Sequence, residues 1–231
     1  MTTYRVQGEW RARIAAEYTS AAVTQHLVLW LMQAGAPPDL IDEGLAIVAD
    51  ELAHSRLSHD VYVAAGGSAP PVLDPTQLGL ARVSDELLLD ILRVAVRVFC
   101  LGETVAVPLF QHLRAPCTEP VAKLALDRIL RDEVRHREFG WDLLDWLLTL
   151  EARLADAVAA MLPAMFRELA RSYGLGNTAV ASDDGSMPDA ERAWGLAPPR
   201  EYAGVLARTV ERDYRPRFAA RAIPMPADVV P

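Results

Sequence analysis

Apolar residues recur every three to four positions through most of the chain, a spacing typical of amphipathic helices rather than strands. Five long stretches carry this pattern, and Gly, Pro, Ser or Thr residues flank their ends. They cover about residues 9–34, 39–65, 84–113, 118–150 and 151–173. The pattern predicts an all-α protein.

The segments between these helices differ in length. Residues 67–84 contain several Gly and Pro residues and little apolar repetition, which indicates a long connection between the second and third helices. Residues 178–189 are expected to form a flexible loop, and about 199–214 a short helix. The remaining prolines predict an extended tail; they are Pro216, Pro224, Pro226 and Pro231. We therefore expect a helical bundle over residues 1–174, with residues 175–231 packed on it.

Two glutamates occupy positions where the pattern calls for an apolar side chain. Glu17 is in phase with Ala21 on the first helix, and Glu103 follows Phe99 by four residues on the third. Burying a carboxylate without a partner costs several kcal/mol, so either the stripe is exposed there or the carboxylate has a partner. Gly102 next to Glu103 would allow a local widening of the helix.

The pattern Asp-Glu-x-x-His occurs twice, at residues 50–54 and 132–136. On a helix the Glu and the His lie three residues apart and share one face. A single copy is most often a polar pair on a solvated surface. Two copies, each within an amphipathic helix, are not expected by chance in this composition, and we interpret them as two halves of one metal site.

The spacing of the four glutamates supports this interpretation. Glu17 and Glu51 lie 34 residues apart, and Glu103 and Glu133 lie 30 apart, so each pair can reach the same height in a helical hairpin. Four carboxylates in a low-dielectric core repel one another, and two divalent cations would cancel their charge. The predicted ligands are Glu17, Glu51, His54, Glu103, Glu133 and His136.

The residue types narrow the metal and its surroundings. Carboxylates with two imidazoles suit iron, and manganese or a mixed Mn/Fe pair fits the same donors. Asp50 and Asp132 are expected to hold the imidazoles by accepting the second ring N–H; the alternative is an exposed helical Asp. His26, His59 and His112 fall off the site face.

Composition excludes several classes of partner. The net charge of −8 argues against nucleic acid bound through a basic face. No uncharged apolar run reaches about 18 residues, so no membrane association is expected. The two cysteines form no C-x-x-C pair, which favours a reducing, cytoplasmic setting.

The six candidate ligands and the paired Glu-x-x-His pattern resemble the ferritin-like superfamily over about residues 9–150. That superfamily includes rubrerythrins, ferritins and di-iron oxidases. Segments around Glu17, residues 36–40, 102–104 and 132–136 are also similar to an uncharacterised bacterial group of ferritin-like proteins. The resemblance implies an antiparallel four-helix bundle with a long second connection, a fifth helix and a C-terminal extension.

Three functions are compatible with such a site. The first is an O2-activating oxidase or monooxygenase with two iron ions, acting on a small organic substrate. The second is a rubrerythrin-like peroxidase, which would need an external donor such as a ferredoxin or rubredoxin because the chain lacks paired Cys motifs. The third is iron storage. Tyr18 and Tyr62 are redox candidates, although packing is the commoner role, and a homodimer is compatible with the sequence.

Overall fold

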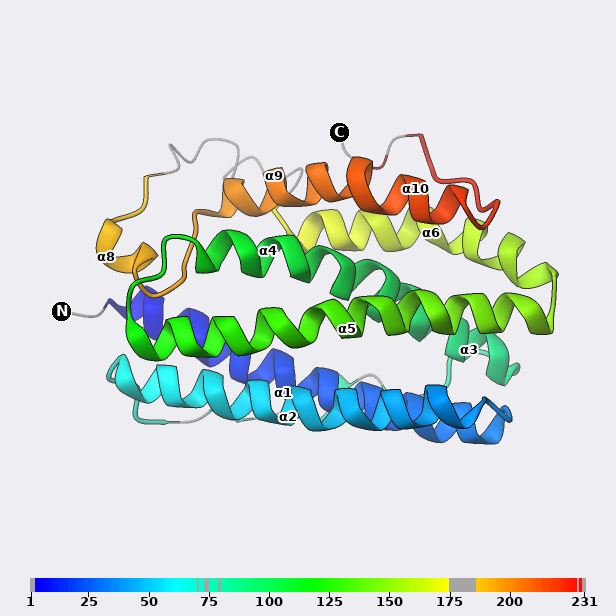
Figure 1. Ribbon diagram of the computed structural model, residues 1–231, viewed down its shortest axis with the longest axis horizontal. Helices are drawn as coiled ribbons and strands as arrows, with labels where there is room; N and C mark the ends of the chain where they lie inside the picture. The colour runs from blue at the N-terminus through cyan, green and yellow to red at the C-terminus, as the bar shows by residue number, and fades with distance from the viewer. Residues whose placement is uncertain are drawn as a thin grey trace. The chain divides into compact units, whose positions relative to one another are not determined.

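The computed structural model contains only helical elements within the part of the chain that it describes (Figure 1). The expectation of an all-α protein is confirmed for these residues. The chain divides into two compact units, which are considered one at a time. The structure describes residues 3–69, 71–72, 75–78, 80–174, 186–227 and 229.

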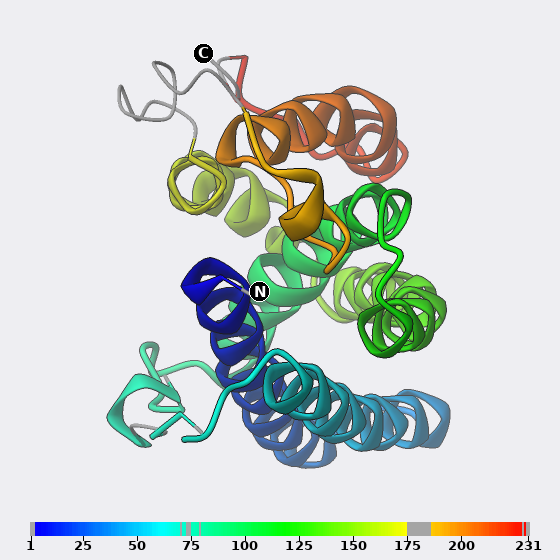
Figure 2. The same ribbon diagram turned by 90° about the vertical axis from the view of Figure 1, so that its left-hand side faces the viewer.

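Unit 1 is built around two long helices, α1 (Tyr4–Gln33) and α2 (Pro38–Ala64). They run side by side in opposite directions (Figures 1 and 2). The unit is formed from Met1–Leu87, Phe110–Asp132 and Pro188–Leu196. Its other elements are η1 (Pro75–Leu78), α8 (Asp189–Arg192) and the first part of α5 (Pro120–Leu150).

Local signals explain where α1 and α2 begin and end. Thr3 caps α1 by accepting a hydrogen bond from the Val6 backbone N–H, so the helix begins earlier than the apolar pattern suggested. Gly35, with φ of +72°, allows the turn that follows α1. Pro38 suits the first turn of α2 because its missing N–H would have no intrahelical partner.

Side-chain hydrogen bonds define the register between α1 and α2. Gln7 Nε2 donates to the Ala65 carbonyl at 2.8 Å, and Ser55 Oγ donates to the Ile14 carbonyl at 3.1 Å. In each pair the two residue numbers add up to about 70. A residue near position n of α1 therefore faces a residue near position 71 − n of α2.

A segment from late in the sequence completes unit 1. The Ala193 carbonyl accepts hydrogen bonds from the backbone N–H groups of Thr118 and Glu119, both at 2.9 Å. Trp10 Nε1 donates to the Trp194 carbonyl at 3.1 Å. Of the loop expected over 178–189, residues 178–185 lie outside the described part, and Asp189 already begins α8.

Unit 2 contains most of the continuous helical segment formed by α3 (Leu87–Val94), η2 (Ala95–Glu103) and α4 (Thr104–Arg114), together with the C-terminal helices. It is formed from Leu88–Leu109, Glu133–Met187 and Ala197–Pro231. Its elements are α3, η2, the first part of α4, the second part of α5, α6 (Arg153–Ser172), α9 (Pro199–Thr209), η3 (Val210–Tyr214) and α10 (Arg215–Ala219). The last residues of α4, from Phe110, belong to unit 1.

The path from Leu87 to Arg114 is helical throughout, but its middle part, η2, is a π-helix that ends at Glu103. Gly102, which the sequence marked as able to allow a local widening, lies within this π-helix. Tyr214 Oη, from a second π-helical stretch, donates to the Leu101 carbonyl at 2.5 Å. This bond satisfies a backbone carbonyl within the buried part of η2.

The prediction of an extended tail from Pro216 onward is wrong for its first residues. Pro216 is the second residue of α10, a position where its fixed φ suits a helix. Arg217 pairs with Glu138 at 2.9 Å and Arg221 with Asp145 at 2.6 Å, which ties α10 and the turn after it to α5. Both guanidinium groups also lie over the Trp141 ring. These contacts explain why the helix continues to Ala219.

Candidate metal centre

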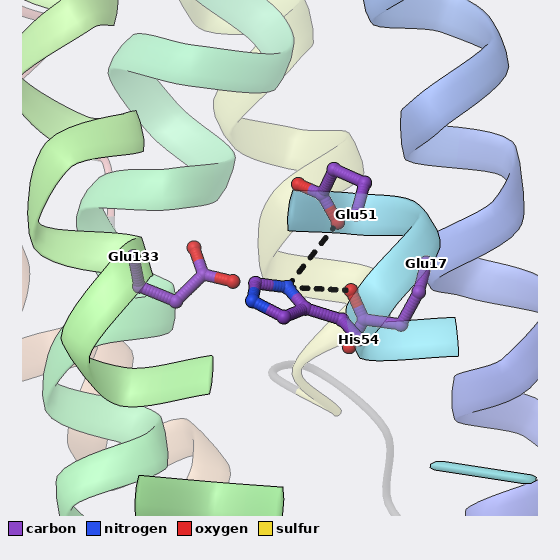
Figure 3. Close-up of side chains that lie close together, drawn as sticks. All are labelled: Glu17, Glu51, His54 and Glu133. Carbon is purple, nitrogen blue, oxygen red and sulfur yellow. Dashed lines mark ion pairs between the residues drawn. The ribbon is translucent and has the colours of Figure 1, made fainter. Parts of the chain in front are cut away.

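Unit 1 contains a buried group of three potential metal ligands: Glu17 from α1, and Glu51 and His54 from α2 (Figure 3). One ligand atom from each lies within 4.8 Å of the others. His54 Nδ1 is 3.8 Å from Glu17 Oε2 and 3.6 Å from Glu51 Oε2. Ser20 Oγ donates to the other Glu51 oxygen at 3.0 Å and so fixes that carboxylate. We call these three ligands the unit 1 triad.

The two carboxylates of this triad control the charge of His54. Burial by itself lowers the pKa of His54, but hydrogen bonds and electrostatic attraction from Glu17 and Glu51 outweigh it and raise the pKa to about 10. In the metal-free protein the imidazole is therefore positively charged at neutral pH. A metal cation at this position would replace that proton as the partner of both carboxylates.

A network of ion pairs holds the far side of the His54 ring. His54 Nε2 lies 3.1 Å from Asp132 Oδ2. Arg128 donates from Nε to Asp132 and from Nη2 to Asp50, the latter at 3.1 Å. Burial raises the pKa of Asp132, but hydrogen bonds from Arg128, His54 and Arg131 outweigh it and lower the pKa. Asp132 is thus a carboxylate that orients His54 with Nδ1 toward the triad.

Unit 2 contains the second group: Glu103 at the end of η2, and Glu133 and His136 on α5. All three are buried, and one ligand atom from each lies within 4.8 Å of the others. His136 Nδ1 is 3.6 Å from Glu133 Oε2. The i, i+3 spacing of the sequence pattern accounts for this pair. We call these three ligands the unit 2 triad.

A close approach of η2 to α5 positions the unit 2 triad. Gly140 lies one turn after His136, and a Cβ added to it would lie 2.5 Å from Phe99 Cβ and 2.8 Å from the Phe99 backbone carbon. Only glycine permits this spacing. Trp141 Nε1 donates at 3.0 Å to Oγ1 of Thr104, the residue that directly follows Glu103. These two contacts fix the position of Glu103 relative to α5.

The charges of the unit 2 triad act on Tyr173, a residue that the sequence did not indicate. Burial raises the pKa of its hydroxyl, and the charges of Glu103 and Glu133 raise it further, so the phenol stays protonated. Its ring lies 6.3 Å from the Tyr202 ring. Tyr173 follows the last residue of α6, where no pattern marks a functional side chain. Arg128 was missed as well, because an Arg four residues before an Asp resembles an ordinary surface pair.

The remaining candidates lie away from both triads. Among the described residues, no group of potential ligands includes His26, His59 or His112, and all three side chains are partly exposed. Of the tyrosine candidates, Tyr18 is exposed, and Tyr62 donates its hydroxyl to the Ala69 carbonyl at 3.0 Å.

The donor atoms of the two triads fit a metal ion. Each triad offers carboxylate oxygens and one imidazole nitrogen in a buried setting, and such donors suit iron or manganese better than a structural zinc ion. Both triads could therefore hold a metal. Within the described residues, no helix is both long enough and apolar enough for a membrane span. No family model, curated protein or solved structure matches the chain.

Proposed function

We propose that the two triads bind a pair of metal ions in one dinuclear site. The observation that carries this proposal is the continuity of α5, which runs unbroken from Pro120 to Leu150. Asp132 of this helix contacts His54 of the unit 1 triad, and the next residue, Glu133, belongs to the unit 2 triad. A ferritin-like four-helix bundle would bring the triads together in this way.

Charge balance supports two divalent ions rather than one. The two triads contribute four carboxylates and two imidazoles. The imidazoles are neutral when they bind metal, whereas the carboxylates are negatively charged. Two divalent cations cancel four negative charges, whereas one would leave two carboxylates uncompensated in a buried setting. The proposed ions are iron, with manganese or a mixed pair fitting the same donors.

The reaction that we propose is O2-dependent oxidation or oxygenation of a small organic substrate. Two ferrous ions would supply electrons for the reduction of O2. His54 and His136 would each bind one ion, and Asp132 would keep His54 oriented. The π-helix that ends at Glu103 favours an enzyme over a storage protein, since such distortions are frequent at functional sites.

The proposal is tested with the full chain produced in iron-replete medium. Its iron content is measured, the protein is reduced without air, and it is mixed with O2 or with hydrogen peroxide. We expect about two Fe per chain and faster oxidation by O2. Faster oxidation by peroxide would indicate a peroxidase with an external electron donor, and uptake of many iron ions would indicate storage.

Matched variants separate the metal site from general effects on the fold. Glu133→Gln removes a triad carboxylate and should lower the iron content. Glu168→Gln removes an exposed carboxylate of unit 2 that pairs with Arg97, and should leave the iron content unchanged. Wild-type protein without bound metal, although correctly folded, would contradict the proposal.

A further inference from the structure

Unit 1 contains a buried arginine close to the triad that the proposed metal site does not use. Arg13 lies on α1, and its side chain is 9% exposed. Its guanidinium group lies over the Trp10 ring at 4.4 Å and near the Phe110 ring at 5.9 Å. The aromatic rings contact the face of the guanidinium group, so its N–H groups, which point outward in the plane, determine which hydrogen-bond acceptor it binds.

Only one edge of this guanidinium group is engaged. Arg13 Nη2 donates to the Gly195 carbonyl at 3.2 Å and lies 3.5 Å from the half-exposed Glu9 carboxylate. Arg13 Nη1 is buried, and the described residues provide no hydrogen-bond partner for it. Ser58 Oγ on α2 is likewise buried and unpartnered in the described part of the chain. Buried donors without an acceptor are rare and costly.

The register between α1 and α2 relates Arg13 and Ser58 to the triad. Arg13 precedes Glu17 by four residues, and Ser58 follows His54 by four, so each shares a helix face with its triad residue. The numbers of Arg13 and Ser58 add up to 71, as do those of Glu17 and His54, which form an ion pair. Arg13 and Ser58 therefore form the next level of the same interface, about 6 Å along the helix axis.

We propose that Arg13 Nη1 and Ser58 Oγ bind the carboxylate group of an organic acid one helical turn from the unit 1 triad. A carboxylate accepts several hydrogen bonds, and its single charge matches one guanidinium group. Phosphate would bring more negative charge next to Glu17 and Glu51. The proposal rests on the proposed function, because it identifies the substrate of that metal site as a carboxylic acid.

The test measures binding of simple organic acids to the iron-loaded full chain by calorimetry. The probes are butyrate, octanoate and benzoate, each compared with its neutral amide and with inorganic phosphate. We expect saturable binding of at least one acid and at least tenfold weaker binding of its amide. The variant Arg13→Gln should weaken acid binding by about 10- to 100-fold, as expected for loss of a charged hydrogen bond.

Two further variants keep the test decisive. Ser58→Ala removes only a hydroxyl group and should weaken acid binding about threefold or more, even where Arg13→Gln fails to fold. Arg11→Gln removes an exposed charge from the same helix and should change nothing. The proposal is overturned if no acid binds, if acids and amides bind alike, if phosphate binds more tightly than every acid, or if the folded Arg13 and Ser58 variants bind like the wild type.

The metal content of the same samples separates this proposal from the proposed function. Arg13→Gln should retain about two Fe per chain, because Arg13 is not a metal ligand. Wild-type protein that binds iron but no acid would overturn the carboxylate site alone. Wild-type protein that binds an acid in an Arg13-dependent manner but no iron would overturn the proposed metal site instead.

Discussion

The His54 ring and the Asp132 carboxylate lie 3.1 Å apart, Nε2 to Oδ2, and join α2 to α5 within unit 1. The other ring nitrogen, Nδ1, faces Glu17 and Glu51. The imidazole thus has one nitrogen toward a fixed carboxylate and one toward potential metal ligands. This division is common in protein metal sites, where a carboxylate fixes the orientation and tautomer of the ligand histidine.

Replacing Asp132 with Asn should weaken metal binding without removing a ligand. The amide has nearly the same shape but carries no charge, so His54 loses part of its orientation and basicity. We expect metal affinity to fall by about 10- to 100-fold, measured by competition with a chelator. Asp127→Asn removes an exposed carboxylate of the same helix and should have no such effect. Unchanged affinity in Asp132→Asn would contradict the assigned role of Asp132.

The stability of the metal-free protein should depend on pH through His54. Its pKa is about 10 in the folded protein, against an ordinary value of 6.5. Because the folded protein binds this proton more tightly than the unfolded chain, the contribution is fully present below about pH 6.5 and is lost as the pH rises through 10. The free energy of unfolding, measured with urea, should decrease over this window.

The variant His54→Gln provides the comparison, since it has no imidazole to titrate. Its free energy of unfolding should change less between pH 7 and pH 10 than that of the wild type. Metal affinity should show the opposite trend and increase with pH, because the metal must displace the His54 proton. Parallel pH profiles for the wild type and the variant would exclude His54 as the titrating group.

Gly140→Ala should destabilise unit 2. The new methyl group would lie 2.5 Å from Phe99 Cβ, so η2 and α5 would have to move apart at an expected cost of about 1–3 kcal/mol. Gly102→Ala is the matched control, because among the described residues its methyl group would meet the Arg97 carbonyl alone, at an ordinary contact distance of 3.6 Å. That change should be neutral or stabilising by up to about 1 kcal/mol. Thermal unfolding of both variants distinguishes the two outcomes, and equal melting temperatures would be inconsistent with a close helix approach.

Tyr214→Phe should show how much the hydrogen bond from Tyr214 to the π-helix η2 contributes to the stability of the fold. The change removes a buried hydroxyl group that donates to the Leu101 carbonyl, two residues before Glu103. A buried carbonyl without its donor costs about 1–3 kcal/mol. Tyr4→Phe removes a hydroxyl from an exposed ring and should leave the unfolding free energy unchanged. Similar stability of the two variants would show that the hydrogen bond contributes little.

Local sequence signals were sufficient for three of the long helices. Periodicity and end signals located α2, α5 and α6 to within two residues, since Pro38, Pro120 and the Gly residues after the helices act on their immediate neighbours. A glycine next to a carboxylate on an apolar stripe made a local widening possible, but the sequence did not specify the nine-residue π-helix. The antiparallel bundle and the full set of six ligands in one site remain predictions.

Contacts between distant segments could not be predicted from the sequence. The Ala193 carbonyl meets Thr118 and Glu119, but nothing in the local pattern of either segment specifies the other. Arg217 and Arg221 hold the region around α10 through Trp141, whereas the prolines alone suggested an extended tail. The same limit applies to the site. Four candidate ligands followed a repeated pattern and two occupied apolar stripes, whereas no local signal marked Arg128 as the partner of both Asp132 and Asp50.

Titration of the metal-free full chain with ferrous ion determines whether the two triads form one dinuclear site. Binding should saturate at about two ions per chain, and Mössbauer spectra after oxidation should show two ferric ions that are magnetically coupled through bridging ligands. Saturation at one ion, no binding, or two ferric ions without magnetic coupling would contradict a shared site.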